Sequence, residues 1–368
     1  MSLESFHTSG TSPSRCRVAI LGFGTVGSAV ARRLTTDAAH TFELTHIFDR
    51  RADLKRRRIA GDAIAWTTCV EDVLSSGVDI VVEALGAVEP ASGWIRAALL
   101  AGKSVVTANK QAIAEHLPAL STLAARQGRQ LRFEAAVGGA MPIVRAVADG
   151  LSGDRITRIV AILNGTTNAV LSRMDARGCS LEDALAHARG AGYAEADPTL
   201  DLNGSDARAK LAILCALAFG LRVAPDAIPA VSAESITPQQ FAEARRHGGT
   251  IRQLAHAEYD AARAVLTAWV APLVVPRSSI FARATGPQNA ALITGVHSGD
   301  IGIFGRGAGG DATAAAILSD LIAIARDRAA IVPAPVLTSE FTIDCGDFSR
   351  TRSTFQVPNS TFPFAEAV

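Results

Sequence analysis

The segment from residue 192 to residue 210, GYAEADPTLDLNGSDARAK, concentrates acidic residues and one lysine around a single proline and an Asn-Gly turn. The chain then continues into the apolar run LAILCALAFG. Carboxylates bind ammonium groups, and a lysine that is partly removed from water can exchange a proton near neutral pH. The segment therefore predicts a site that holds a small zwitterion and moves one proton. Its acids and lysine are Glu195, Asp197, Asp201, Asp206 and Lys210.

Lysine is rare in this chain, so the positions of its lysines are informative. The sequence has 4 lysines and 32 arginines, and two of the lysines are Lys110 and Lys210. Arginine stays protonated in proteins, whereas lysine can release its proton when its surroundings favour it. Asp206 and Lys210 are four residues apart, which places them on one face of a helix. An ordinary ion pair of about 0.2–0.5 kcal/mol would explain the same spacing.

A glycine motif near the N-terminus follows the apolar stretch RVAIL and precedes the helical stretch SAVARRLTTDA. In this context Gly22 permits a tight turn, Gly24 lets backbone N–H groups approach a pyrophosphate, and Gly27 allows a helix to pack closely on a strand. The motif predicts a Rossmann-type dinucleotide site. Its residues are Gly22, Phe23, Gly24, Thr25, Val26 and Gly27.

The next predicted strand ends at Asp49, 22 residues after Gly27. An acid at this point can accept hydrogen bonds from both ribose hydroxyls, which favours NAD. Arg50, Arg51 and the basic run at residues 55–58 indicate the opposite, because they can neutralise the 2′-phosphate of NADP. The sequence therefore leaves both cofactors open, with a preference for NAD.

Composition excludes several other classes of function. A net charge of +1 and the lack of an extended basic block give no indication of a nucleic-acid partner. No run of 18 apolar residues predicts a membrane span. The five cysteines are scattered without a CxxC or Cys/His cluster, which indicates neither a disulfide framework nor a zinc site and fits a cytoplasmic protein.

The predicted elements fall into two groups. Short apolar strands alternate with helical stretches in the first part, which is typical of a parallel sheet covered by helices. After Gly153 the runs indicate a second, half-exposed sheet with its own helices, one of which starts with Ser180 and Asp183 as a capping pair. The predicted strands are residues 17–21, 43–48, 78–84, 104–107, 131–135, 158–163, and runs near 264–275 and 290–293.

We therefore expect an α/β protein, with a Rossmann-type parallel-sheet domain and a second α+β domain for substrate binding and dimerisation. A length of 368 residues favours about two to three domains. An amphipathic helix after the loop GRGAGG is expected to pack back on the first domain. The expected divisions are a disordered leader at 1–16, a dinucleotide-binding domain at 17–150 completed by about 305–340, a substrate and dimerisation domain at 151–304, and a tail of unknown packing at 341–368.

Six motifs between residue 17 and about residue 320 make the chain resemble the homoserine dehydrogenase family. They are ILGFGTVGSAV, VVTANKQAIA, FEAAVGGAMPI, ILNGTTNAVL, AGYAEADPTLDLNGSDARAKLAIL and GRGAGGDATAAAIL, of which the fifth is the longest and most specific. The resemblance implies an oxidoreductase that interconverts L-homoserine and L-aspartate-4-semialdehyde with NAD or NADP, in threonine and methionine biosynthesis.

The resemblance also assigns roles to single residues. Lys110 and Lys210 match the two active-site lysines of the family, with Asp206 beside them, and we expect Lys210 or a water next to it to exchange the proton. The residues expected to bind substrate are Glu195, Asp201, Tyr193, Gly165 and Thr166. The turn that begins at Asn164 either presents donors to the substrate carboxylate or simply precedes a helix.

Further residues are expected at the cofactor and at a cation. Leu85, Gly86, Asn109 and Lys110 follow predicted strands and are expected at the cofactor. Gly305, Arg306 and Gly307 match a second loop of the family that closes over the cofactor, and a tight turn or a helix cap explains the same residues. Glu134, Val137, Gly139 and Met141 match a site for sodium or potassium. A glycine-rich turn with Glu134 capped locally explains the same residues almost as well.

Two other functions remain open from the sequence. A dehydrogenase of the same architecture could act on another small amino acid, although the 195–210 segment argues against this. A non-catalytic Rossmann protein that binds nucleotide as a sensor would have the glycines but would not need the lysines and acids. We expect a small-molecule substrate and a homodimer, because a half-exposed sheet can bury apolar surface against a second copy.

Overall fold

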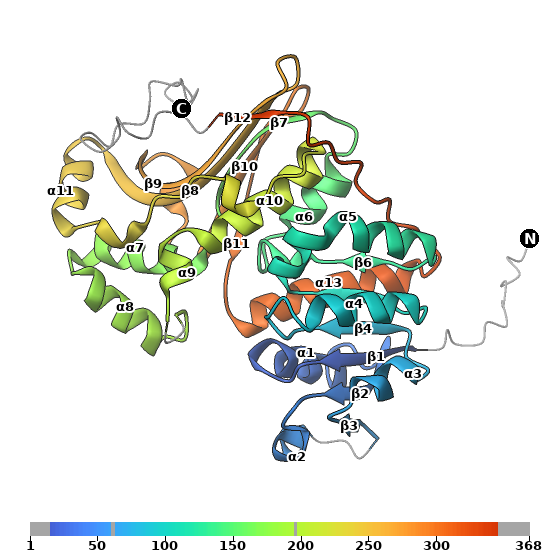
Figure 1. The fold of residues 1–368 in the computed structure, drawn as a ribbon. Coiled ribbons are helices and arrows are strands. Elements are labelled where there is room, and N and C mark those ends of the chain that lie inside the picture. Colours follow the sequence, from blue (N-terminus) through green and yellow to red (C-terminus); the bar gives the residue numbers. More distant parts are fainter. Residues whose placement is uncertain (1–14, 60–62, 195–196, 345–368) are drawn as a thin grey trace, which may run out of the picture.

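The computed structural model describes residues 15–59, 63–194 and 197–344, and these form two sheets with helices around each (Figure 1). The described part contains no helix long and apolar enough to cross a membrane.

The first sheet is fully parallel, with strand order β3-β2-β1-β4-β5-β6. The order reverses between β1 and β4, and ligands of such sheets bind beyond the carboxyl ends of the strands at that point. The prediction of a Rossmann-type parallel sheet is therefore confirmed. The strands are β1 (Cys16–Leu21), β2 (Phe42–Phe48), β3 (Ala65–Thr67), β4 (Ile80–Glu83), β5 (Ser104–Thr107) and β6 (Leu131–Arg132).

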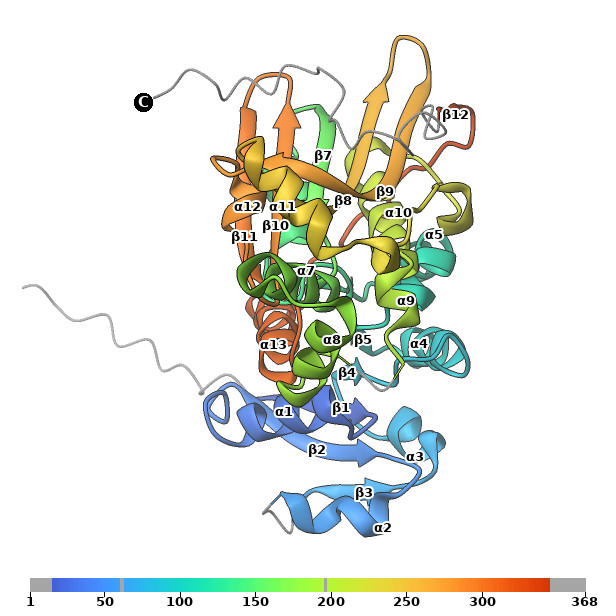
Figure 2. The same ribbon diagram turned by 90° about the vertical axis from the view of Figure 1, so that its left-hand side faces the viewer.

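Helices cover both faces of this sheet, which is why its strands are apolar on both sides. Figure 2 shows α1 and α13 on one side and α3 and α4 on the other. Ile317 and Leu321 of α13 pack in one apolar cluster with Val18 and Ile20 of β1. The helix after the loop GRGAGG thus returns to the first sheet, as the sequence predicts. The helices are α1 (Thr25–Thr35), α2 (Ala52–Lys55), α3 (Val70–Ser75), α4 (Ala91–Leu100), α5 (Lys110–Arg126) and α13 (Gly310–Arg326).

The second sheet has the order β11-β10-β7-β8-β9-β12 and is antiparallel except for the β9–β12 pair. It therefore makes a second, mixed-sheet domain, and the predicted α/β fold with a second α+β domain is confirmed. The strands are β7 (Ile156–Ile162), β8 (Gly249–Asp260), β9 (Val265–Pro276), β10 (Gln288–Gly295), β11 (Gly299–Arg306) and β12 (Thr342–Asp344).

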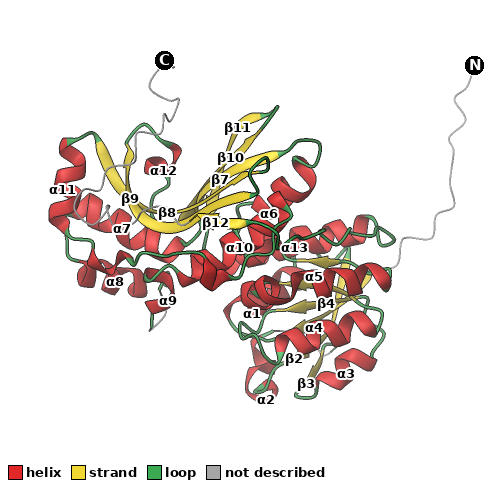
Figure 3. Ribbon diagram, turned by 45° about the horizontal axis from the view of Figure 1, so that its top comes forward, coloured by secondary structure: helices red, strands yellow, loops and turns green. Residues whose placement is uncertain are grey.

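Helices α7 and α10 lie on the face of the second sheet that is turned toward the first domain (Figure 3). Helix α10 also packs on α5, so it joins the two domains. The α-helices here are α6 (Ile143–Arg145), α7 (Gly165–Arg177), α8 (Leu181–Gly190), α9 (Thr199–Leu202), α10 (Ser205–Phe219), α11 (Pro238–Arg246) and α12 (Ile280–Arg283). Short turns of other helix types are η1 (Arg56–Arg58), η2 (Glu134–Ala136), η3 (Ala146–Gly150), η4 (Pro225–Ala227) and η5 (Ala233–Ser235).

One predicted strand is shorter in the structure, and two stretches outside the predicted domains contribute to strands. The strand expected at 131–135 ends at Arg132, because the chain turns into η2 and the Glu134 N–H donates to Asp320 (2.9 Å). Strand β1 begins at Cys16, inside the stretch expected to be a leader. Residues 342–344 of the expected tail pair with β9 as β12. The expectations for residues 1–14 and 345–368 lie outside the described residues.

Candidate active site

A cavity of about 440 Å³ opens beyond the carboxyl ends of the parallel strands, where the two domains meet. Helix α5 begins at Lys110, directly after β5, and α10 brings Asp206 from the second domain. Thr25 and Val26 of the glycine motif line the same cavity. Lys110 and Asp206 of the predicted catalytic residues therefore share one space with the predicted dinucleotide loop, and Lys210 lies behind Asp206, outside the lining. Its lining includes Lys110, Thr166, Tyr193, Asp201, Asp206, Ala308, Gly309 and Gly310.

Asp206 lies between the two lysines. Its Oδ1 is 2.8 Å from Lys110 Nζ, and its Oδ2 is 2.7 Å from Lys210 Nζ. Lys210 also donates to the backbone oxygen of Leu163 (2.8 Å). Asp206 is 6% exposed. Burial alone would raise the pKa of Asp206, but the two lysines lower it well below its usual range, so the carboxylate is charged.

Asn164 joins the two acids of the cavity. Its side-chain Nδ2 donates to Asp201 Oδ1 (2.7 Å) and to Asp206 Oδ2 (2.9 Å), while its Oδ1 accepts from the Thr167 N–H (2.7 Å). Burial raises the pKa of Asp201, and the Asn164 hydrogen bond opposes this. The amide donors of Asn164 are thus used within the protein, and binding of a substrate carboxylate by the other donors of this turn stays a prediction.

The other predicted substrate residues lie at the same cavity or beside it. Thr166 donates its hydroxyl to the Tyr193 backbone oxygen (2.6 Å), and both residues line the cavity. A side chain at Gly165 would meet Pro287 O at 2.9 Å, so only glycine fits beside the loop before α13. Glu195 lies outside the described residues. Asp197 accepts from Thr199, which is ordinary turn chemistry.

The glycine motif has the backbone that a dinucleotide loop requires. Gly22 has a φ of +99°, and a Cβ on Gly27 would stand 1.9 Å from Gly22 O. Gly24 has open space where a Cβ would be. The first residues of α1 and α13 adjoin, because a Cβ on Gly310 would stand 3.0 Å from Thr25 Cγ2. Two helix N-termini therefore meet at this loop, and both favour an anion such as a pyrophosphate.

Alanine at these glycines is expected to act in two different ways. Gly27→Ala forces α1 away from the loop and should lower the melting temperature by several degrees and abolish cofactor binding. Gly24→Ala should fold normally and weaken dinucleotide binding at least about tenfold, because the methyl group occupies the approach to the backbone. Thermal unfolding and titration with the dinucleotide separate the two effects. Equal losses of stability in both variants would contradict this assignment.

The Asp49 carboxylate accepts hydrogen bonds from groups of the protein itself. Its Oδ2 accepts from Lys55 Nζ (2.6 Å) and from the Phe23 N–H (2.9 Å), and its Oδ1 accepts from the Arg51 N–H (2.9 Å). Burial would raise the pKa of Asp49, but these hydrogen bonds lower it below its usual value. Lys55, but not Asp49, borders a second cavity of about 570 Å³, which is also lined by Gly24, Thr25, Arg32, Arg51, Arg58 and Asp311.

The sequence predicted the acid in this pair but not its partner. Lys55 was counted only as part of a basic run, and the structure places it on Asp49 with its second bond to Phe23 O (3.0 Å). The predicted cofactor residue Arg50 is exposed and does not border the cavity, whereas Arg51 does.

The predicted loops after β4 and β5 are tied together by Glu83, a residue that sequence reasoning missed. Glu83 is fully buried and accepts from the Thr107 hydroxyl and from the Leu85 N–H (2.7 Å). Asn109 donates to Ala87 O (2.6 Å) and caps α5, so it fixes the helix that begins with Lys110. An acid as the last residue of a buried apolar strand was the signal for this role.

The predicted loop at residues 305–307 packs against the glycine-rich turn at residues 138–141. The Ala140 N–H donates to Arg306 O (2.8 Å), and a Cβ on Gly139 would stand 2.7 Å from Gly307 O. Gly305 and Arg306 end strand β11, and the next residues, from Ala308, line the cavity of Asp206. The loop is therefore a strand end that leads into α13.

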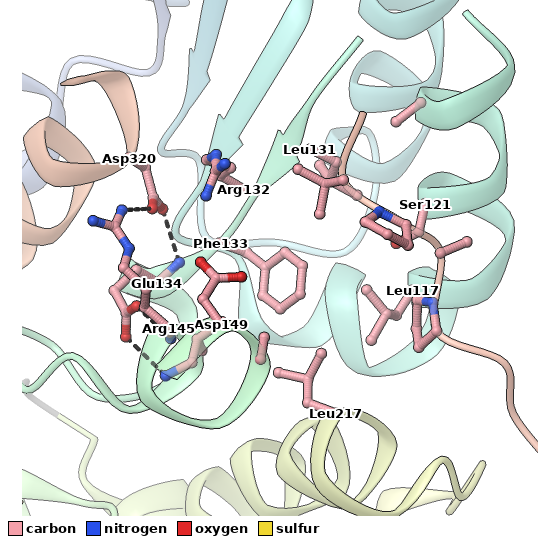
Figure 4. Close-up of a pocket in the computed structure, with 17 residues that line it drawn as sticks. Leu117, Ser121, Leu131, Arg132, Phe133, Glu134, Arg145, Asp149, Leu217 and Asp320 are labelled. Atoms are coloured by element: carbon pink, nitrogen blue, oxygen red, sulfur yellow. Dashed lines mark hydrogen bonds and ion pairs between the residues drawn. The ribbon is translucent and has the colours of Figure 1, made fainter. Parts of the chain in front are cut away.

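The predicted cation residues lie in this turn and at its start. The Glu134 carboxylate accepts from the Val144 and Arg145 N–H groups (2.9 Å each), beside a cavity of about 250 Å³ (Figure 4). Burial raises the pKa of Glu134 to about 7. Within residues 15–59, 63–194 and 197–344, no three His, Cys, Asp or Glu side chains gather to hold a metal ion. A cation at Val137, Gly139 and Met141 would depend on backbone carbonyls.

Comparison with protein families gives two adjacent matches. Residues 142–322 match the model described as homoserine dehydrogenase, and residues 22–134 match the model described as homoserine dehydrogenase, NAD binding domain. Together they cover most of both sheets, and they leave out strands β1 and β12 and residues 135–141.

Individual relatives agree with these matches. The chain is 41% identical to a homoserine dehydrogenase of Mycobacterium leprae, over 84% of this chain and 72% of the relative. It is 35% identical to that of Corynebacterium glutamicum, over 97% and 82%. The crystal structure of a homoserine dehydrogenase from Thiobacillus denitrificans superposes with a TM-score of 0.82 at 33% identity, covering 90% and 80%. A hyperthermophilic archaeal homoserine dehydrogenase in complex with NADPH gives 0.71 at 26% identity, covering 86% and 99%.

Proposed function

The chain belongs to the homoserine dehydrogenase family, and from this premise we propose that its cavity at Asp206 oxidises L-homoserine to L-aspartate-4-semialdehyde and catalyses the reverse reduction. The observation that carries the proposal is Asp206, buried between Lys110 and Lys210 beside the dinucleotide loop. That arrangement supplies proton transfer next to a nicotinamide site.

Each side chain has a distinct task in this proposal. NAD or NADP, when bound, supplies the group that exchanges a hydride with the substrate carbon. Lys210 in its amine form, or a water beside it, takes the hydroxyl proton, and Asp206 stabilises the ammonium that results. Lys110 contacts the other oxygen of Asp206 and provides the second positive charge of the site. Asp201, with Glu195, binds the substrate ammonium.

The activity is tested by following the absorbance of the reduced nicotinamide at alkaline pH. Homoserine with NAD or NADP should give a signal that threonine, serine and glutamate do not give. Activity with another amino acid instead of homoserine would favour a different dehydrogenase of the same architecture. Cofactor binding without any turnover would favour a nucleotide-binding sensor.

For the cofactor, we propose that NAD is used at least as well as NADP, and that Asp49 and Lys55 act in opposite directions. Asp49 disfavours a 2′-phosphate by its charge. Lys55 neutralises that charge and borders a cavity with Arg51 and Arg58, which favours the phosphate. The balance between these two side chains sets the preference.

Reciprocal variants test this balance. Asp49→Ser releases the Lys55 ammonium and should shift the ratio of kcat/KM toward NADP at least about tenfold, roughly 1.4 kcal/mol. Lys55→Gln leaves Asp49 uncompensated and should shift the ratio toward NAD by a similar factor. Arg56→Gln, on an exposed neighbour outside the cavity, serves as the control. The proposal fails if both variants shift the ratio in one direction, or if the wild type prefers NADP more than tenfold.

We also propose a homodimer formed through the second domain, and a sodium or potassium ion bound by the turn at residues 137–141. Phe304 on the edge strand β11 is 63% exposed, and this exposed aromatic side chain supports a contact with a second copy of the chain. Sedimentation velocity tests the dimer. Activity assays in sodium, potassium and tetramethylammonium salts of equal ionic strength test the cation.

The scattered free cysteines support a cytoplasmic location.

A further inference from the structure

Asn164 stands where strand β7 passes into helix α7, and its side chain can adopt only one orientation. Its Oδ1 accepts from the Thr167 N–H (2.7 Å) and caps the helix, and the residue is 4% exposed. A backbone N–H cannot accept a hydrogen bond, so the Oδ1 must face Thr167. The two N–H groups of the amide must therefore face the acids.

Those two N–H groups are divided between Asp201 (2.7 Å) and Asp206 (2.9 Å). Asp206 is buried and Asp201 is half-buried, and two carboxylates this close to one nitrogen would otherwise repel each other or share a proton. A neutral group with two donors separates them and gives each its own hydrogen bond. The same junction holds Lys210 through Leu163 O and holds the Asp201 backbone oxygen through the Thr167 hydroxyl (2.9 Å).

We propose that Asn164 is a positioning residue that divides the acidic pair, holding Asp206 on the lysines and leaving Asp201 directed at the substrate. This inference rests on the proposed function of the cavity, and it adds a role that helix capping alone does not require. Serine or threonine caps α8, α11 and α12 in this protein, and Asn109, which caps α5, donates to a backbone oxygen and not to two acids. At Asn164 the side chain must supply one acceptor and two donors, which serine and aspartate do not.

The test separates capping from division of the acids. Asn164→Ser keeps a good helix cap, but its single hydroxyl can donate to only one of the two acids. Asn164→Asp keeps the cap and the size but adds a third carboxylate, in a cluster whose other charged groups are Asp201, Asp206, Lys110 and Lys210. Ser180→Ala removes the cap of α8 instead and is the matched control.

We expect Asn164→Ser to lower kcat/KM for homoserine at least tenfold, with an unchanged KM for the dinucleotide. Asn164→Asp should move the acidic limb of the pH–rate profile toward higher pH, because the crowded carboxylates retain a proton. Ser180→Ala should leave both quantities unchanged. Wild-type kcat/KM and an unmoved limb in both Asn164 variants would reduce the residue to a helix cap.

A second measurement does not depend on turnover. Crowding of the carboxylates raises the pKa of the cluster in the folded Asn164→Asp protein, so the cluster retains a proton. The stability of this variant relative to wild type should therefore be greatest at low pH and fall as the pH rises from 5 to 8. The melting-temperature difference should therefore widen by several degrees toward pH 8. A constant difference would overturn the inference. Inactivity of the wild type with homoserine would instead reject the proposed function, and the melting temperatures would still decide the role of Asn164.

Discussion

Replacing Lys210 with arginine is expected to lower kcat by at least about a hundredfold and to leave the fold intact. Lys210 Nζ contacts Asp206 (2.7 Å) and Leu163 O (2.8 Å), and a guanidinium can still bond to both. It cannot release a proton at any working pH, however, and general acid–base catalysis contributes about 10²–10⁴ to rates. The loss should therefore appear in kcat at every pH, with little change in KM for the dinucleotide.

Lys103→Arg is the matched control for this change. Lys103 is buried and donates to two backbone oxygens, Ser76 O (2.6 Å) and Val78 O (3.3 Å), but it precedes strand β5 and so lies at the opposite end of that strand from Lys110. Its variant should keep wild-type kcat. If Lys210→Arg turns over within about tenfold of wild type while both variants melt normally, Lys210 takes no part in proton transfer.

The strands of the parallel sheet could be predicted because burial on both faces makes them continuous apolar runs. Strand β8 could not, because its buried positions include Thr250, Arg252 and Gln253. Arg252 is fully buried, and its Nη1 donates to the Thr250 hydroxyl and to the Ile251 backbone oxygen, while its buried Nε has no hydrogen-bond partner among the described residues. A pattern of apolar and polar residues does not reveal such a strand.

In the site, the sequence predicts contacts between residues that are close along the chain and does not predict contacts between distant ones. The ion pair of Asp206 with Lys210 follows from a spacing of four on one helix, so the sequence predicts it. The contact of Lys110 with Asp206 depends on how α5 packs on α10, and no local spacing encodes that. The bridge that Asn164 makes between Asp201 and Asp206 is equally non-local, so the sequence does not predict it.

Replacing Asp206 with asparagine should destabilise the protein by about 3 kcal/mol and lower kcat at least about a hundredfold. Asp206 is the buried acid that both Lys110 and Lys210 contact, and removal of one partner from a buried ion pair typically costs about 3–5 kcal/mol. The lower end applies because Lys110 is partly exposed. Without the carboxylate the two ammonium groups repel each other, and neither remains placed for the substrate.

Urea unfolding at several pH values tests how the stability contributed by Asp206 depends on pH. The folded pKa of Asp206 lies below its ordinary value of 3.8, so its stabilisation is present above that pH and is lost as the pH falls further. The gap in unfolding free energy between wild type and Asp206→Asn should thus be constant near neutral pH and narrow below about pH 4. Asp226→Asn is the control, because Asp226 pairs with Arg208 at 3.2 Å but its side chain is 94% exposed. That variant should match wild type. An equal unfolding midpoint for Asp206→Asn would mean that the two lysines do not depend on this carboxylate.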